Sequence, residues 1–210
     1  MIRQFDEAYW NDRYGSHGHI WSGNPNPQLV AEVSALPAGT ALDVGCGEGA
    51  DAVWLAGRGW QVTGVDISSV ALERAAGHAA GLELPGSLAW RQLDLLAWTP
   101  PEGAFDLVSA QFMQLPRADR GPLFARLAAA VAPGGTLLVV GHAPSDMDSG
   151  ARRPHRAEVL FDAGEVVSAL DPGLWQVLVA ESRPRQSEGH GGGPVAVHDE
   201  VVRASRRADV

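Results

Sequence analysis

Three aspartates lie at the ends of short apolar segments, where each could bind a polar ligand. Asp43 stands two residues before the glycine-rich stretch "GCGEG", Asp66 ends "VTGVD", and Asp94 lies in "RQLDL". A carboxylate in such a place can accept hydrogen bonds from ribose hydroxyls or attract an ammonium group. The three residues therefore indicate a site for a nucleoside with a positively charged tail.

The glycine-rich stretch could hold more than one kind of ligand. Gly45, Gly47 and Gly49 let the backbone turn tightly and approach a ligand without interference from a Cβ atom. The same letters also fit the dinucleotide fingerprint, so a nicotinamide-dependent oxidoreductase is an alternative. Asp43 and Glu48 would repel a pyrophosphate, but they would attract a tail that carries an ammonium group. The charges therefore favour the nucleoside with a cationic tail.

The elements that must position these residues alternate along the chain. The pattern predicts strands followed by helices, with strands at 40–45, 61–67, 89–95, 105–111 and 135–142 and helices at 49–58, 69–80 and 120–132. Such alternation is typical of a parallel sheet with helices on both faces. The carboxyl ends of parallel strands meet at one edge of the sheet, where open α/β folds bind ligands, so we expect the aspartates to gather there.

The last third of the sequence has a different pattern. Two further strands, at 175–183 and 195–205, flank a glycine-rich turn and predict an antiparallel hairpin. We therefore expect an α/β fold, a Rossmann-like doubly wound sheet of seven mostly parallel strands that ends in an antiparallel C-terminal hairpin. Residues 1–210 are predicted to form one domain, with an N-terminal helical cap (1–38), a cofactor-binding core (39–142), and a substrate loop with the hairpin (143–210).

Composition and charge exclude several classes of function. All 16 basic residues are arginine, so the chain has neither the lysine of a Walker phosphate loop nor one that could form a Schiff base. The net charge of −9, without a long basic run, disfavours a nucleic-acid partner. The single cysteine excludes an internal disulfide. No apolar run is long enough to cross a membrane, and the first residues lack the features of a secretory signal, so we expect a cytoplasmic location.

Five segments, in their order along the chain, resemble the motifs of class I S-adenosylmethionine-dependent methyltransferases. They are "LDVGCGEG", "VTGVDIS", "LDL", "FDLVSAQF" and "VAPGGTLLVV", which lie between about residues 40 and 142. The N-terminal "YWNDRYGSHGHIWSGNPN" is similar to the cap of the small-molecule members related to tellurite-resistance and thiopurine methyltransferases. The resemblance implies methyl transfer from S-adenosyl-L-methionine to a small molecule, by in-line displacement at the sulfonium methyl group.

The resemblance also implies residues that bind the cofactor. Asp43 and the turn around Gly45, Cys46 and Gly47 would hold the methionine part, and Asp66 would accept hydrogen bonds from both ribose hydroxyls. The adenine would lie against Ile67, Asp94 and Leu95. The remaining cofactor-binding candidates are Trp21 in the cap and Gln111, which would lie beside the sulfonium group.

The candidate catalytic residues are Gln111 and His142, each at the end of a predicted strand. His142 could act as a base or shape the pocket, and an acceptor that is already an anion needs no base. The wall of the substrate pocket is predicted to include Tyr9, Trp10, Trp21, Asn24 and Met113. Four residues, His142, Asp146, His155 and His198, match no standard metal-ligand spacing, so no metal is expected. Since these patterns report binding and not turnover, a non-catalytic protein that binds the cofactor is a further alternative, and the oligomeric state stays open.

Overall fold

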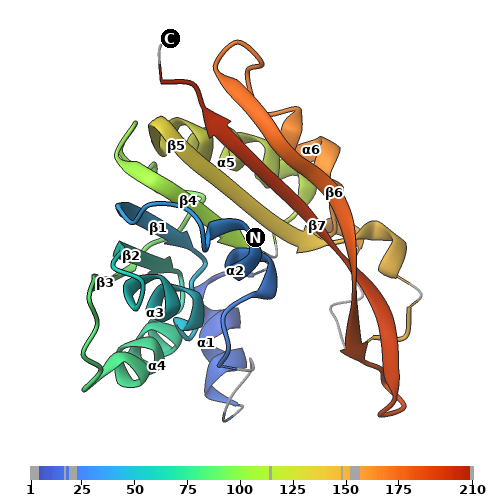
Figure 1. Ribbon diagram of the computed structural model, residues 1–210. Coiled ribbons are helices and arrows are strands. Elements are labelled where there is room, and N and C mark those ends of the chain that lie inside the picture. The colour runs from blue at the N-terminus through green and yellow to red at the C-terminus, as the bar shows by residue number, and fades with distance from the viewer. Residues whose placement is uncertain are drawn as a thin grey trace.

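The protein is described by a computed structural model that covers residues 5–16, 18, 23–113, 115–147, 149–151 and 157–208. Seven strands form one mixed sheet in the order β3-β2-β1-β4-β5-β7-β6 (Figure 1). The strands are β1 (Thr40–Val44), β2 (Gln61–Asp66), β3 (Ser87–Gln92), β4 (Phe105–Gln111), β5 (Val131–His142), β6 (Trp175–Glu188) and β7 (Pro194–Arg206). Strands β1 to β5 pair in parallel, and β7 lies antiparallel between β5 and β6. The predicted fold class is confirmed.

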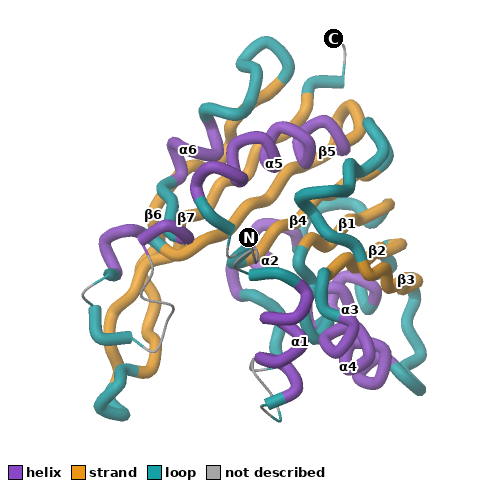
Figure 2. Tube along the Cα trace, turned by 180° about the vertical axis from the view of Figure 1, so that it is seen from behind, coloured by secondary structure: helices purple, strands orange, loops and turns teal. Residues whose placement is uncertain are grey.

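Helices cover both faces of the sheet. Helices α2 (Pro27–Val33) and α3 (Ala50–Ala56) pack on the face that Figure 1 presents, and α5 (Arg117–Ala130) and α6 (Ala163–Val167) pack on the face seen in Figure 2. Successive side chains of a strand point to opposite faces, so Leu137 and Val139 join the core under α5 whereas Leu138 and Val140 join the core under α2. Strands buried on both faces explain the continuous apolar runs in the sequence.

Two further helices, at the N-terminus and after β2, lie next to each other. Helix α1 (Glu7–Gly15) contacts α4 (Ser69–Ala79), although more than fifty residues separate them in the sequence. The Asn11 side chain accepts a hydrogen bond of 2.7 Å from Ser68 Oγ, at the N-cap of α4. The Glu7 carboxylate accepts a hydrogen bond of 2.8 Å from Gln92 Nε2, at the end of β3. Helix α1 is therefore fixed at the edge where β2 and β3 end.

The predicted bounds of three strands were wrong by three residues or more. The strand expected at 135–142 begins at Val131, as β5. The third strand was expected at 89–95, but β3 ends at Gln92 and Asp94 lies beyond it. Asp94 turns the chain instead, because its side chain accepts a hydrogen bond of 2.9 Å from Leu96 N and its carbonyl accepts from Ala97 N and Trp98 N. The strand expected at 175–183 continues to Glu188 through Pro184, which an edge strand can accommodate.

The longer hairpin extends past the rest of the sheet, as Figure 1 shows. Pairing of β5 with β7 ends at His142 and Asp199, whereas β6 and β7 continue to pair as far as Glu188 and Pro194. Because β6 runs parallel to β5, this extension lies beyond the carboxyl edge of the sheet. It therefore places residues of the hairpin near the predicted site.

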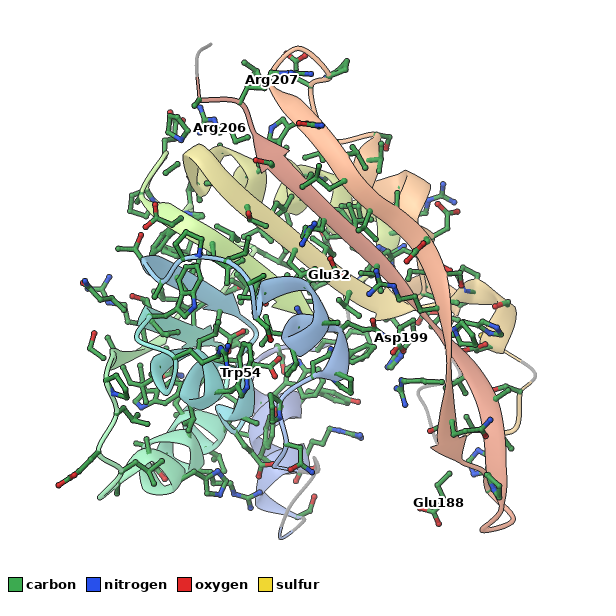
Figure 3. The ribbon with its side chains drawn as sticks, in the orientation of Figure 1. Glu32, Trp54, Glu188, Asp199, Arg206 and Arg207 are labelled. Atoms are coloured by element: carbon green, nitrogen blue, oxygen red, sulfur yellow. The ribbon has the colours of Figure 1, made fainter. Side chains whose placement is uncertain are left out.

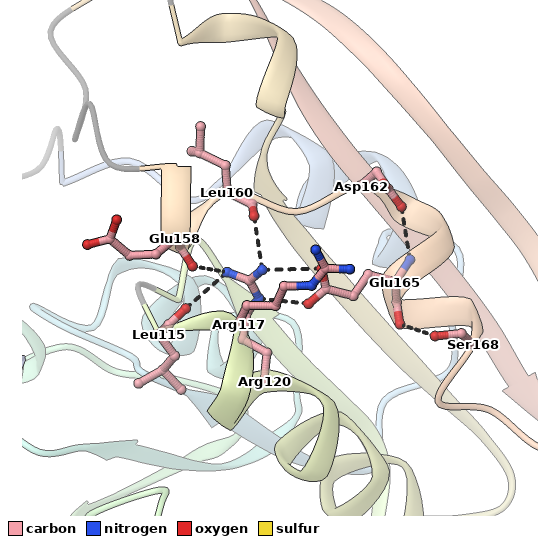
Figure 4. Close-up of polar contacts among 8 residues, drawn as sticks. All are labelled: Leu115, Arg117, Arg120, Glu158, Leu160, Asp162, Glu165 and Ser168. Carbon is pink, nitrogen blue, oxygen red and sulfur yellow. Dashed lines mark hydrogen bonds and ion pairs between the residues drawn. The ribbon is translucent and has the colours of Figure 1, made fainter.

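A buried arginine joins the segment after β4 to the segment before α6 (Figure 4). The side chain of Arg120, in α5, is 2% exposed, and all five of its N–H groups have acceptors. Nε and Nη2 donate to the two carboxylate oxygens of Glu165 over 2.9 and 3.2 Å. Nη1 and Nη2 also donate to the carbonyls of Leu115, Glu158 and Leu160 over 2.6 to 3.0 Å.

Among the described residues, no helix has the length and apolar character needed to span a membrane.

Candidate functional site

A cleft of about 1470 Å³ lies along the carboxyl edge of the sheet. Ten of the predicted catalytic and cofactor-binding residues line it, namely Asp43, Gly45, Cys46, Gly47, Asp66, Ile67, Asp94, Leu95, Gln111 and His142. Tyr9, Trp10, Asn24 and Met113, predicted as substrate wall, line it too. Trp21 lies outside the described residues. The cleft exceeds the roughly 300–1,000 Å³ of a typical small-ligand site, so it can hold two ligands together.

The glycine turn is built around backbone conformations that favour glycine. Gly45, Gly47 and Gly49 have φ values of 69°, 53° and 84°. At Gly49 a Cβ atom would lie 2.7 Å from the Trp90 ring and 2.8 Å from Ala75 Cβ, so no larger residue fits there. Gly45 N and Cys46 N both donate to Val65 O, which fixes the turn against β2. The turn thus joins β1 to α3 with its backbone open to the cleft.

Asp43 places a carboxylate inside the protein with one oxygen unsatisfied. The residue is 2% exposed, and its Oδ2 has no hydrogen-bond partner among the described residues. Burial raises the pKa of Asp43 well above its usual value, and the nearby carboxylates of Asp51 and Asp66 raise it further. An unpaired buried carboxylate is costly, and a cationic ligand in the cleft would remove that cost.

Asp66 contacts the glycine turn directly. Its Oδ2 accepts a hydrogen bond of 2.9 Å from Gly47 N, and its Oδ1 accepts one of 2.9 Å from Ser68 N. Burial raises the pKa of Asp66, against the effect of these backbone N–H groups. A carboxylate can accept about four hydrogen bonds. Each oxygen of Asp66 therefore keeps capacity for a ligand hydroxyl.

A third carboxylate, Asp51, completes the acidic end of the cleft. It stands in the first turn of α3, and its Oδ1 accepts a hydrogen bond of 2.6 Å from Asn26 N. Burial raises the pKa of Asp51 to about 6. We define Asp43, Asp51 and Asp66 as the acidic triad. The three carboxylates repel one another, so a positive ligand would stabilise the triad in its charged form.

Glu48 does not have the role that the sequence suggested. It was expected to act with Asp43 on the charge of the ligand, but its Oε1 is 2.9 Å from Arg74 Nη1, and the pair is largely buried. Arg74 also donates to Tyr14 O over 2.7 Å, which ties the cap to α4. The arginine neutralises Glu48 locally, and Asp51 is the second acid beside Asp43.

Gln111 is held in place from both ends of its amide. Its Oε1 accepts a hydrogen bond of 2.7 Å from Asn26 Nδ2, and its Nε2 donates over 2.9 Å to Ser109 Oγ. Asn26 also caps α2 by accepting from Gln28 N. Asn26 therefore links the end of the cap to α3 and β4, and Gln111 has a fixed orientation at the edge of the cleft.

Phe112, directly after β4, has a backbone conformation that is rare for a large side chain. Its φ is 51°, which costs about 1–2 kcal/mol for a residue with a Cβ atom. Its ring stacks on His142, with centroids 4.4 Å apart and planes at 23°. Arg185 Cζ, from β6, lies 5.8 Å from the same ring centroid. All three side chains line the cleft, and they come from β6 and from the ends of β4 and β5, on one side of the strands that carry Asp43 and Asp66.

Aromatic side chains of the cap line the cleft. Phe5, Tyr9 and Trp10 form a cluster, with edge contacts at 5.2 and 5.3 Å between ring centroids. Phe5 is buried against Val159 and Leu160, which come from the segment after β5. The segment after β5 therefore packs against the N-terminal residues that line the cleft.

Cys46 lacks the surroundings of a nucleophile. Burial raises the pKa of its thiol well above the usual value, and the carboxylates of Asp43 and Asp66 raise it further. The thiol is therefore neutral at physiological pH. In the described part of the chain, no three His, Cys, Asp or Glu side chains are grouped so as to hold a metal ion, and His155 lies outside that part.

Sequence reasoning missed four residues of this site: Asn26, Asp51, Phe112 and Arg185. Asp51 had a usable signal, since it stands in the first turn of the helix that follows the glycine turn. Arg185 had none, because its place depends on the length of the hairpin, which brings residues more than seventy positions apart together.

Comparison with known proteins agrees with this geometry. A family described as "Methyltransferase domain" matches residues 41–135. A trans-aconitate 2-methyltransferase of Rhizobium meliloti is 41% identical over 127 residues, which are 59% of this chain and 46% of that protein. A probable thiol methyltransferase 2 of Arabidopsis thaliana is 32% identical over 145 residues, 67% of this chain and 64% of that protein. The chain thus spans about half to two thirds of the length of these relatives.

A solved structure has the same fold over almost the whole chain. The structure, described as "Conversion of a Disulfide Bond into a Thioacetal Group during Echinomycin Biosynthesis", covers 97% of this chain and 93% of its own, with a TM-score of 0.72 and 23% identity. None of these matches supports a nicotinamide-dependent oxidoreductase. The segment that carries the glycine turn, the acidic triad and Gln111 matches the methyltransferase domain family, and this match confirms the resemblance to class I S-adenosylmethionine-dependent methyltransferases.

Proposed function

We propose that the protein transfers a methyl group from S-adenosyl-L-methionine to a small-molecule acceptor, in the cytoplasm and within one domain. The observation that carries this proposal is the unsatisfied Oδ2 of Asp43, buried beside the glycine turn in a cleft that can hold two ligands. The ammonium group of the methionine tail would be its partner. The names of the two relatives, which refer to trans-aconitate and to thiols, support a small-molecule acceptor.

The described residues fit the parts of this cofactor. Asp43 and the backbone of the glycine turn would hold the methionine part, and Asp66 would accept hydrogen bonds from the ribose hydroxyls. Ile67, which follows β2, and Asp94 and Leu95, which follow β3, would border the adenine. Gln111, fixed by Asn26 and Ser109, would lie beside the sulfonium group.

The protein has little chemistry to supply beyond binding and orientation. S-adenosylmethionine supplies a methyl group that is already activated by a positively charged sulfur. An acceptor lone pair would take up this methyl group by in-line displacement, and the bonding pair of the carbon–sulfur bond would stay on sulfur. Gln111 would orient the reacting groups, and the aromatic side chains of the cap would exclude water. His142 would take a proton only from an acceptor that arrives protonated.

Calorimetric titration of the purified protein tests the cofactor assignment. We expect S-adenosylmethionine and S-adenosylhomocysteine to bind with micromolar affinity and NAD not to bind. Asp66→Ala removes the acceptor of the ribose hydroxyls and should weaken binding about tenfold to a hundredfold, since hydrogen bonds to a charged group are lost.

Glu102→Gln is the matched control, because Glu102 is exposed in the loop before β4 and should leave binding unchanged. Absence of binding by either sulfur compound to the folded wild-type protein would contradict the proposal. Binding without methylation of any thiol, phenol, amine or carboxylic acid in a broad panel would instead favour the non-catalytic alternative.

A further inference from the structure

Charges are separated along the cleft. The acidic triad lies where β1 and β2 end, whereas Arg185 comes from β6, on the other side of β4, β5 and β7 in the sheet. At about 4.8 Å between neighbouring strands, β1 and β6 are about 19 Å apart. The negative and the positive side chains therefore come from opposite sides of the sheet.

Arg185 reaches back over the sheet toward the centre of the cleft. Its guanidinium carbon lies 5.8 Å from the ring centroid of Phe112, the residue directly after Gln111. Its Nε donates to Asp199 Oδ2 over 2.7 Å. Asp199 is fully buried on β7, opposite His142 in the strand register (Figure 3). These two contacts fix the plane of the guanidinium group.

The outer edge of the Arg185 guanidinium is available to a ligand. In the described part of the chain, Nη1 and Nη2 have no hydrogen-bond acceptor, although the side chain is only 32% exposed. These two nitrogens donate in parallel, and such a pair matches a carboxylate. The ring of Phe112 lies beside the guanidinium, with its centroid 5.8 Å from Arg185 Cζ.

We propose that the methyl acceptor carries a carboxylate group and that Nη1 and Nη2 of Arg185 bind this group. The inference rests on the proposed function and adds the chemical class of the acceptor. Arg185 would attract the carboxylate of the acceptor, and the acidic triad would repel it from the part of the cleft that binds the cofactor. An acceptor held in this way extends from Arg185 along Phe112 toward Gln111, where the methyl group would be presented.

A purely structural role for Arg185 is the competing explanation, since it also neutralises the buried Asp199. The double substitution Arg185→Gln with Asp199→Asn separates the two roles, because it removes the cation without leaving a buried charge unpaired. Arg183→Gln is the matched control. Arg183 lies on the same strand, and its Nη2 pairs with Glu32 over 2.6 Å, outside the cleft.

The test is calorimetry on protein saturated with S-adenosylhomocysteine. The probes are three carboxylates and their isosteric amides: benzoate and benzamide, fumarate and fumaramide, cinnamate and cinnamamide. We expect at least one carboxylate to bind wild-type protein at least tenfold more tightly than its amide. Arg185→Gln and the double variant should lose about tenfold to a hundredfold in affinity for that carboxylate, with the affinity for S-adenosylhomocysteine unchanged.

Arg183→Gln should bind the carboxylate like the wild type. Equal binding of carboxylates and amides, or a carboxylate preference that persists in the double variant, would overturn the inference while leaving the proposed function intact. If wild-type protein does not bind S-adenosylhomocysteine, the proposed function itself fails. The first step of the titration therefore distinguishes the two failures.

Discussion

Replacing Arg120 by methionine should lower the free energy of unfolding by about 3–5 kcal/mol, the cost typical of removing one partner from a buried ion pair. Methionine fills a similar volume but has no N–H group. The substitution leaves Glu165 without its bidentate partner and the carbonyls of Leu115, Glu158 and Leu160 without their donor. Because each unsatisfied buried acceptor adds its own penalty, we expect the high end of this range.

Arg117→Met is the control for Arg120→Met. Arg117 begins the same helix and approaches the same Glu165, but at 4.0 Å and with its side chain 84% exposed. An exposed pair of this kind contributes little, so the change in stability should stay below about 1 kcal/mol. Urea unfolding of both variants measures the difference. A loss of less than about 1 kcal/mol in Arg120→Met would show that the buried contacts do not stabilise the fold.

Arg120 also connects stability to the site. Leu115 lines the cleft, and Leu160 packs against Phe5 at its rim. The guanidinium holds the carbonyls of both residues, so the wall of the cleft on this side depends on a side chain that does not itself line the cleft. In the Arg120→Met variant, we therefore expect weaker cofactor binding even at temperatures where the protein is folded.

The central half of the chain could be predicted closely because local signals decide its structure. The alternation of apolar strands and helices predicted the order β1 to β5 along the chain, and the three glycines and Asp66 predicted the position of the glycine turn. These signals act over a few residues, since a strand ends where its apolar run ends and glycine is needed where φ is positive. The end of β3 was misplaced because Asp94 forms a turn through its own side chain, which competes with the extended strand.

The parts of the site that depend on contacts between distant segments, such as the position of Arg185 and the pairing of Glu48, could not be predicted in the same way. The first strand of the hairpin was expected to end at residue 183, because the proline and glycine that follow are typical of a turn, yet strand pairing continues to Glu188. Arg185 therefore reached the cleft without any local signal. Likewise, the pairing of Glu48 with Arg74 depends on how α4 packs, so the sequence pointed to the wrong second acid. Long-range packing decides these positions, and patterns within one segment do not report it.

Asp51→Asn should stabilise the ligand-free protein about twice as much at pH 7.5 as at pH 5. Burial raises the pKa of Asp51 from 3.8 to about 6, so the folded protein holds this proton more tightly than the unfolded chain does. The stability that the protonated carboxyl provides is complete below about pH 4 and is lost as the pH rises through 6. Asparagine stays neutral and keeps an oxygen for Asn26 N, so it avoids this loss of up to about 3 kcal/mol.

For cofactor binding the order should be reversed, with the wild type binding more tightly than Asp51→Asn at pH 7.5. A cationic ligand stabilises the ionised triad, so the affinity of wild-type protein for S-adenosylmethionine should rise between pH 5 and 7.5, and Asp51→Asn should lose most of this rise. Thermal unfolding of both proteins at the two pH values, with and without the cofactor, measures both effects. If Asp51→Asn is less stable than wild type at pH 7.5 without ligand, the triad is not destabilising. The result expected here, higher stability with weaker binding, would mean that the cleft keeps three carboxylates close together, two of them buried, for the sake of a positive ligand.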